Sequence, residues 1–193
     1  MNASESIVQS YFQYVESIYT RANVRGVGQA ELDLVGVRIS NQTPTYYHVE
    51  STVSISAAFS KITDDKYDPE HAKQRGKQAK QRRTVGFILA KKFNSKEVIA
   101  TYQQLGIDPN NLKRVLVSWD FQEQARQELE SKGVTCLSMQ TILQKLADLL
   151  AKETSDLDSD ILRTLQLFVR AKPKMPAVLS VNTIRRQKKL PRK

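Results

Sequence analysis

Two short segments of alternating polarity constrain this fold most. Residues 31–35 read Glu-Leu-Asp-Leu-Val, and residues 47–53 read Tyr-His-Val-Glu-Ser-Thr-Val. Because successive side chains of a strand point to opposite faces, each segment separates apolar residues from a carboxylate. Between them stands Asn-Gln-Thr-Pro at residues 41–44, which is a turn sequence. The pattern therefore predicts two neighbouring antiparallel strands, over residues 29–39 and 45–56.

Asp33 and Glu50 lie near the centres of these two segments. If the polar faces of the strands match, the two carboxylates lie side by side. Ionised carboxylates that close repel each other unless a cation sits between them, and rigid oxygen ligands favour Mg²⁺ or Mn²⁺. The same alternation is typical of a half-exposed sheet, in which both acids only face water. His48 shares the face of Glu50, where a partly exposed strand histidine is favoured over one at the rim of a metal site.

The rest of the chain predicts alternating helices and strands. Asn94 with Glu97, and Asp120 with Glu123, have the spacing of helix capping boxes. Residues 85–90 fit either a buried strand or a helix, and their length favours a strand. Helices are predicted over residues 5–20, 69–83, 95–105, 121–132, 140–153 and 157–171, and further strands over 114–119 and 134–138. A strand, a helix and a strand in that order imply a parallel crossover. The expected fold class is α/β, with a mixed central β-sheet flanked by helices.

Length and composition favour one globular domain followed by a tail. The chain has 193 residues, 40% of them hydrophobic, which is enough for a core. We expect the domain to cover residues 1–171 and residues 172–193 to form a flexible basic arm, because the tail has few apolar residues. No apolar run approaches the ~18–20 residues that span a membrane, and the N-terminus lacks the basic region of a secretory signal. The single cysteine, Cys136, is predicted to be a core residue, and one cysteine without a disulfide fits a cytoplasmic protein.

Positive charge is concentrated in two segments. Residues 71–96 hold nine Lys or Arg and residues 171–193 hold eight, with no acidic residue in either segment. Because the net charge of the whole chain is +10, the remaining residues carry a net charge of −7. A charge run by itself is usually a solvated surface. Two such segments beside a pair of carboxylates favour binding to the phosphates of a nucleic acid.

On these features the chain resembles the PD-(D/E)xK nuclease superfamily, which has the restriction-endonuclease-like fold. The resemblance covers roughly residues 5–150. It depends on the order of the elements and on two local matches, Ala-Glu-Leu-Asp-Leu-Val at residues 30–35 and His-Val-Glu-Ser-Thr at residues 48–52. In that family an Asp on one strand and an Asp or Glu on the next bind one or two divalent metals. The resemblance implies that Asp33 and Glu50 are catalytic metal ligands, that the Ser51 carbonyl is a third ligand, and that Glu16 adds a carboxylate from the first helix.

The chain departs from the family at residue 52. Family members have a lysine two residues after the second acid, which orients or activates the attacking water, whereas this chain has Thr52. A hydroxyl group cannot stabilise developing negative charge as an ammonium does. Another lysine can take the role, with Lys61, Lys77 and Lys80 as candidates, or a second metal can replace it. The third explanation is an inactive site that only binds nucleic acid.

The function implied by the resemblance is that of a metal-dependent endonuclease that hydrolyses DNA phosphodiester bonds. The alternative is a catalytically inactive nucleic-acid-binding protein on a nuclease scaffold, and a weaker one is a basic tail that docks on an acidic protein. A homodimer is a further expectation, because many nucleases of this fold pair to cut two strands. The residues expected to contact nucleic acid are Lys73, Arg75, Lys77, Lys80, Arg82, Arg83, Arg185, Arg186, Lys188 and Lys189.

Overall fold

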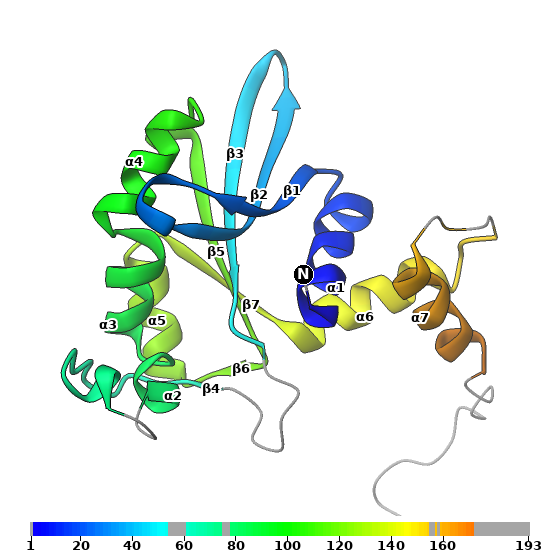
Figure 1. The fold of residues 1–193 in the computed structure, drawn as a ribbon. Coiled ribbons are helices and arrows are strands. Elements are labelled where there is room, and N and C mark those ends of the chain that lie inside the picture. The colour runs from blue at the N-terminus through cyan, green and yellow to red at the C-terminus, as the bar shows by residue number, and fades with distance from the viewer. Residues whose placement is uncertain (1, 54–60, 75–77, 155–156, 158, 172–193) are drawn as a thin grey trace, which may run out of the picture.

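A five-stranded mixed sheet forms the centre of the computed structural model (Figure 1). The structure describes residues 2–53, 61–74, 78–154, 157 and 159–171. The strands, in spatial order, are β1 (Tyr19–Arg25), β2 (Glu31–Ser40), β3 (Thr43–Ser51), β5 (Leu112–Ser118) and β7 (Val134–Ser138). β1, β2 and β3 pair antiparallel, whereas β3, β5 and β7 run parallel. The predicted α/β class with a mixed central sheet is therefore confirmed.

The hairpin of β2 and β3 follows directly from the sequence. Its register pairs Leu34 with Val49 near one end and Ser40 with Thr43 at the other. The two residues between the strands, Asn41 and Gln42, have φ angles of 49° and 64°. Positive φ at both positions is what a two-residue type I′ turn requires, and that turn matches the twist of the strands. The turn thus fixes the register that brings the centres of the two segments together.

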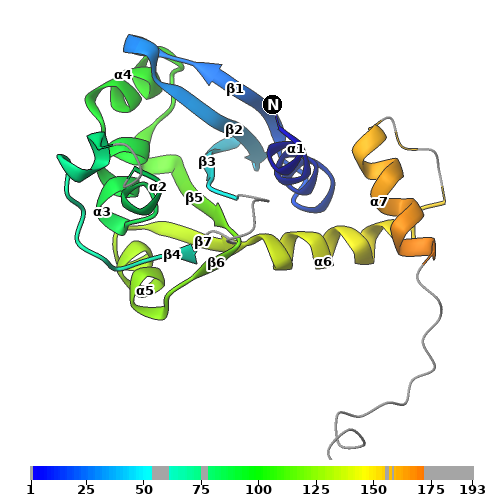
Figure 2. The same cartoon turned by 60° about the horizontal axis from the view of Figure 1, so that its bottom comes forward.

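Helices cover both faces of the sheet (Figures 1 and 2). One layer contains α1 (Ala3–Ser10), the π-helix η1 (Tyr11–Val15), α6 (Met139–Leu150) and α7 (Asp160–Ala171). The other contains α3 (Val85–Phe87), the π-helix η4 (Ile88–Phe93), α4 (Lys96–Gln104) and α5 (Glu123–Ser131). The first layer packs on Leu34 and Val49. In the second layer, α3, η4 and α5 pack on Leu116 and Cys136, which is buried as predicted, and α4 packs on Leu32 in a cluster of its own. The sheet therefore lies between the apolar cores of the two helical layers.

Several short elements complete the fold. They are the 3₁₀ helices η2 (Val27–Gln29), η3 (His71–Lys73) and η5 (Pro109–Asn111), the helix α2 (Gln78–Gln81), and a two-stranded parallel sheet of β4 (Lys61–Ile62) and β6 (Asp120–Phe121). No helix among the described residues is long and apolar enough to span a membrane. The predicted basic tail lies outside the described residues.

The first predicted helix is too long. Helical structure ends at Val15, Ser17 takes a φ of 54°, and β1 begins at Tyr19. A non-glycine residue in this left-handed region ends a helix, because the right-handed helical φ is negative. β1 was missed because it is an edge strand of mostly polar residues without clear alternation.

The segment from residue 69 to residue 93 also differs from the prediction. A continuous basic helix was expected over 69–83, but the described part contains only the short η3 and α2. Residues 85–90, for which a strand was favoured, are helical in α3 and η4. Thr84 caps this helix by accepting a hydrogen bond from the Phe87 amide. An apolar run of this length does not distinguish a buried strand from a buried helix.

Two of the predicted helix caps are also wrong. Ser95 rather than Asn94 caps α4, accepting a hydrogen bond from the Val98 amide. Asp120 lies in β6 and pairs with Lys61 of β4, so α5 begins only at Glu123. Asp120 therefore does not cap α5, because its backbone pairs with β4.

Candidate active site

The structure brings Asp33 and Glu50 together. Because Leu34 pairs with Val49, the next register position places Asp33 beside Glu50 on the opposite face. The Ser51 amide donates a hydrogen bond of 2.8 Å to Oδ2 of Asp33. The side chain of Asp33 is 20% exposed and that of Glu50 is 1% exposed. The two carboxylates therefore lie at the floor of a site, with Asp33 nearer to solvent.

Glu50 is held by a buried histidine. Nε2 of His48 lies 2.8 Å from Oε1 of Glu50, and Nδ1 lies 2.6 Å from the hydroxyl of Tyr102 on α4. An ionised carboxylate only accepts, so Nε2 of His48 donates its proton to Oε1 of Glu50. His48 is fully buried, so the prediction of a partly exposed histidine is wrong. Its ring packs edge-on against Phe93 of η4 as well.

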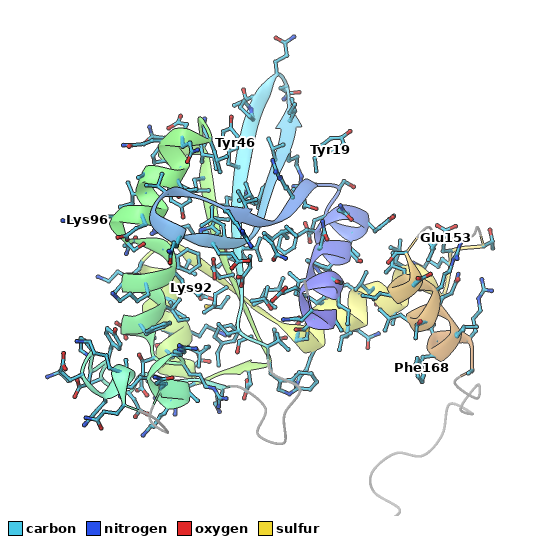
Figure 3. The ribbon with its side chains drawn as sticks, viewed as in Figure 1. Tyr19, Tyr46, Lys92, Lys96, Glu153 and Phe168 are labelled. Atoms are coloured by element: carbon cyan, nitrogen blue, oxygen red, sulfur yellow. The ribbon has the colours of Figure 1, made fainter. Side chains whose placement is uncertain are left out.

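Lys92 completes the site from the helical layer. It lies on η4, and its Nζ is 2.5 Å from Oε2 of Glu50 and 3.9 Å from Oδ1 of Asp33. Figure 3 shows Lys92 on the helical segment beside the sheet. Lys92 is one of the nine basic residues of segment 71–96, but it was not among the predicted site residues. The available signal was its spacing: Lys92 stands four residues after the buried Ile88, so a helix places both on the face that meets the sheet.

The three charges perturb one another. Burial, together with the charge of Glu50, raises the pKa of Asp33 to about 7, although Lys92 and the Ser51 amide act in the opposite direction. Burial also acts to raise the pKa of Glu50, but the hydrogen bond from His48 and the charges of His48 and Lys92 hold this pKa below its ordinary value. For Lys92, burial acts to lower the pKa, and the nearby carboxylates raise it above its usual value. The site is thus an ammonium held between the buried Glu50 and the half-buried Asp33.

Glu16, which was expected to add a carboxylate, lies elsewhere. It accepts a hydrogen bond of 2.5 Å from Tyr11 and forms ion pairs with Arg38 and Lys145 at 3.5 and 3.7 Å. The acid of the first helix whose charge acts on Asp33 is Glu5, which contributes to its raised pKa. The shortened helix explains the error, because Glu16 follows η1 instead of lying in a continuous helix.

The other candidates for the missing lysine are not in the site. Lys61 pairs with Asp120 at 3.4 Å in the small second sheet, and Lys80 pairs with Asp65 at 3.2 Å. Lys77 lies outside the described residues. Thr52, at the family's lysine position, donates hydrogen bonds from its amide and its hydroxyl to the Val117 carbonyl at 2.9 and 3.2 Å. Thr52 therefore extends the contact between β3 and β5.

Basic residues gather beside Lys92. A cleft of about 780 Å³ is lined by Lys73, Arg82 and Arg83, which were predicted to contact nucleic acid, together with Lys91 and Lys92. Lys80 is not among its lining residues. The remaining predicted contacts, which lie outside the described residues, are Arg75, Lys77, Arg185, Arg186, Lys188 and Lys189.

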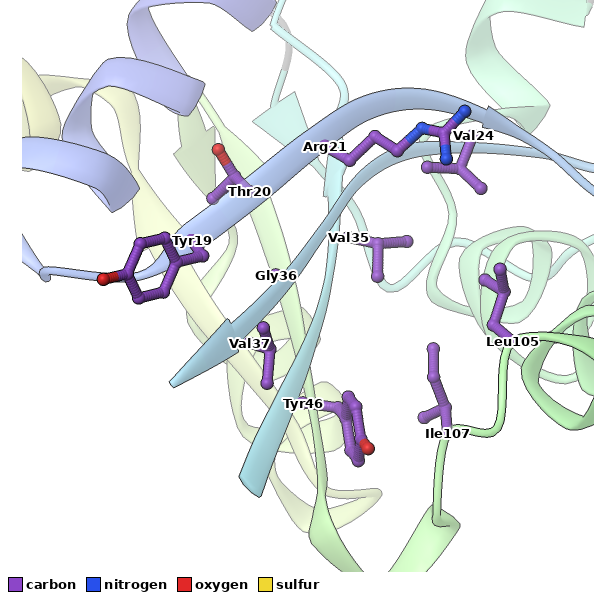
Figure 4. A pocket seen from close by; sticks show the side chains of 10 residues that line it. All are labelled: Tyr19, Thr20, Arg21, Val24, Val35, Gly36, Val37, Tyr46, Leu105 and Ile107. Carbon is purple, nitrogen blue, oxygen red and sulfur yellow. The ribbon is translucent and has the colours of Figure 1, made fainter. Parts of the chain in front are cut away.

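A second hollow lies on the sheet between β1 and the end of α4 (Figure 4). It has a volume of about 330 Å³ and a mostly apolar lining that includes Val35, Tyr46 and Ile107. No carboxylate, histidine or lysine is among the described residues that line it.

Comparisons with known proteins give one structural likeness. No protein-family model and no curated protein matches the sequence. The fold resembles a solved structure of the MspJI restriction endonuclease in complex with a 27-mer oligonucleotide, with a TM-score of 0.38 and 11% sequence identity. The match covers 86% of this chain and 30% of the endonuclease chain, so this chain spans less than a third of that protein.

Proposed function

We propose that the protein is a metal-dependent nuclease that hydrolyses phosphodiester bonds of DNA. The observation that carries the proposal is the convergence of Lys92 on Asp33 and Glu50, at 3.9 and 2.5 Å. Two acids on adjacent strands and one lysine are the residue types that the resemblance to PD-(D/E)xK nucleases requires. In this chain the lysine would come from η4 instead of from position 52.

The donor atoms fit a divalent metal. Oε2 of Glu50 is buried and faces the Lys92 ammonium at 2.5 Å. Oδ1 of Asp33 faces the same ammonium. Hard carboxylate oxygens of this kind suit Mg²⁺ or Mn²⁺. The described residues contain no group of three acidic, histidine or cysteine side chains that could hold a metal. We therefore expect Asp33, Glu50 and the Ser51 carbonyl to hold it together with the substrate.

Each residue of the site would have a separate role in hydrolysis. A bound Mg²⁺ would polarise the scissile phosphate and lower the pKa of a bound water. Asp33 and Glu50 would hold the metal, and His48 would fix the orientation of the Glu50 carboxylate through Oε1. Lys92 would swing from Glu50 toward the phosphate and stabilise the negative charge that develops there.

The non-catalytic alternative also has an observation in its favour. The Lys92 ammonium is close enough to Glu50 to neutralise it, which would make a metal unnecessary. In that case the site would be a structural ion pair, and the basic cleft alone would bind nucleic acid.

A cleavage assay separates the two functions. The purified protein is incubated with single-stranded, duplex and branched DNA in Mg²⁺, Mn²⁺ or EDTA, beside Asp33→Ala and Asp148→Ala. Asp148 lies on α6 and, among the described residues, accepts a single side-chain hydrogen bond, from Gln144. Its alanine variant is therefore the matched control. Metal-dependent cutting by wild type and Asp148→Ala, but not by Asp33→Ala, supports the nuclease. Salt-sensitive binding without cutting supports the alternative.

A further inference from the structure

The basic cleft continues directly from the candidate active site. Its lining includes Ser51 and Thr52 at the end of β3 and Lys92 on η4, and it extends to α2 and the residues that follow α2. The volume of about 780 Å³ falls within the range of ~300–1,000 Å³ that is typical of ligand sites. A strand whose phosphate lies at Lys92 would therefore have its neighbouring nucleotide in this cleft.

Three of the five basic residues that line the cleft have no ion-pair partner among the described residues. Five of its lining residues are basic, and none of the described lining residues is acidic. Lys73 pairs with Glu70 at 2.8 Å and Lys92 with Glu50. Arg82, Arg83 and Lys91 form no ion pair with any described residue, although Lys80 nearby does so. Unpaired cations around a concave surface attract an anion, and arginine suits a phosphate because its guanidinium binds two oxygens.

Two aromatic rings also line the cleft. The rings of Tyr67 and Phe87 meet edge to face, with centroids 5.7 Å apart and an interplanar angle of 74°. Both residues are half-buried. Gly86 permits their approach, because a Cβ at that position would lie 2.7 Å from Cβ of Tyr67. Phe87 also packs against the apolar core that contains Ile88, which holds the pair of rings at the wall of the cleft. Rings placed there offer a face on which a base can stack.

A base reaches these rings only when it is unpaired. Duplex DNA presents phosphates and sugars to a surface groove, while its bases are stacked inside. We propose that the cleft binds one unpaired nucleotide beside the scissile phosphate, with the phosphate on Arg82, Arg83 and Lys91 and the base against Tyr67 and Phe87. The substrate class is then single strands or duplexes with unpaired ends or flaps. This assignment rests on the proposed function, because it takes the phosphate at Lys92 as the one that is cut.

Binding without cleavage tests the cleft. Labelled oligonucleotides of one sequence, as a single strand and as a blunt duplex, are titrated in EDTA with Asp33→Asn as the parent protein. The parent is expected to bind the single strand about tenfold more tightly, in line with one base stacked on an aromatic side chain. Tyr67→Leu should remove most of this difference and leave duplex binding unchanged, whereas Tyr67→Phe should retain it. Tyr14→Leu, at an exposed tyrosine of η1, is the matched control.

A second pair of variants tests the phosphate contacts. Arg82→Gln and Arg83→Gln together should weaken the binding of both substrates and reduce its dependence on salt. Thermal denaturation of each variant checks that the protein still folds. The proposal is overturned if Tyr67→Leu and Tyr67→Phe affect single strand and duplex equally, because the cleft then contacts only phosphates.

The two proposals fail in different ways. If no DNA is cut in the cleavage assay but the single-strand preference and its loss in Tyr67→Leu are observed, the nuclease function is wrong and the cleft assignment stands. If DNA is cut but the blunt duplex is preferred and Tyr67→Leu has no effect, the cleft assignment is wrong and the nuclease function stands.

Discussion

The ammonium nitrogen of Lys92 lies 2.5 Å from Oε2 of Glu50, and so a helix supplies the cation to a carboxylate buried in the sheet. The opposite oxygen of the same carboxylate is held by His48 at 2.8 Å. Glu50 is therefore fixed from two sides. This arrangement supplies an ammonium from η4 to the two carboxylates, without a lysine on the strand itself.

Loss of the histidine should destabilise the protein. His48→Ala leaves the buried Oε1 of Glu50 and the hydroxyl of Tyr102 without their partner, and an unsatisfied buried polar group costs about 1–3 kcal/mol. We expect the free energy of unfolding in urea to fall by about that amount. The matched control is His71→Ala, because the His71 side chain is 44% exposed and pairs only with the equally exposed Asp68, so its loss should change stability by less than about 0.5 kcal/mol. Equal effects of the two variants would show that His48 does not support Glu50.

The stability of the metal-free protein should depend on Asp33. Its pKa is about 7 in the folded protein, against 3.8 for the ordinary carboxyl group. Between these values the folded state holds a proton that the unfolded state has lost, so raising the pH through this window destabilises the fold. The Asp33→Asn variant has no titrating group at this position, so its stability does not change with pH for this reason. In EDTA, urea unfolding should therefore show wild type losing stability relative to Asp33→Asn between pH 3.8 and about pH 7, the two pKa values that bound this window. A constant difference would contradict the raised pKa.

Metal affinity should distinguish Asp33 from Glu16, two acids that the sequence analysis expected in the same metal site. Asp33→Asn removes the charge of a proposed metal ligand, and we expect Mn²⁺ binding, measured by calorimetry, to weaken by about tenfold or more. Glu16→Gln should bind Mn²⁺ as wild type does, because Glu16 is engaged with Tyr11, Arg38 and Lys145. Equal weakening in both variants would mean that Glu16 belongs to the site after all.

Much of the framework can be predicted from local patterns. The alternation around Asp33 and Glu50, with the turn at residues 41–42, gives the hairpin and its register, and β7 falls at the predicted residues. These features depend on period-two alternation and on turn residues, which act over a few positions. The strand β1 escaped prediction because its residues carry little of that alternation.

The lysine of the site could not be found in the same way. Lys92 meets Glu50 only because η4 packs on the sheet, and that contact joins residues far apart in the chain. The apolar run at residues 85–90 suits a strand as well as a helix, and as a strand it would not place Lys92 over the acids. The assignment of Glu16 failed for a related reason, since the end of the first helix is set by the backbone turn at Ser17.

Cleavage by lysine variants tests the central claim most directly. Lys92→Ala, the control Lys96→Ala, and the double variant Lys92→Ala/Thr52→Lys are compared with wild type on the best-cut DNA in Mg²⁺. Lys96 is an exposed lysine of α4 that does not line the cleft, whereas Thr52 and Lys92 both line it, so a lysine at position 52 would approach the site from the strand. We predict that Lys92→Ala lowers the cleavage rate by about 10²–10³-fold, that Lys96→Ala leaves most of the rate, and that the double variant recovers part of the loss. A wild-type rate in Lys92→Ala would contradict the account.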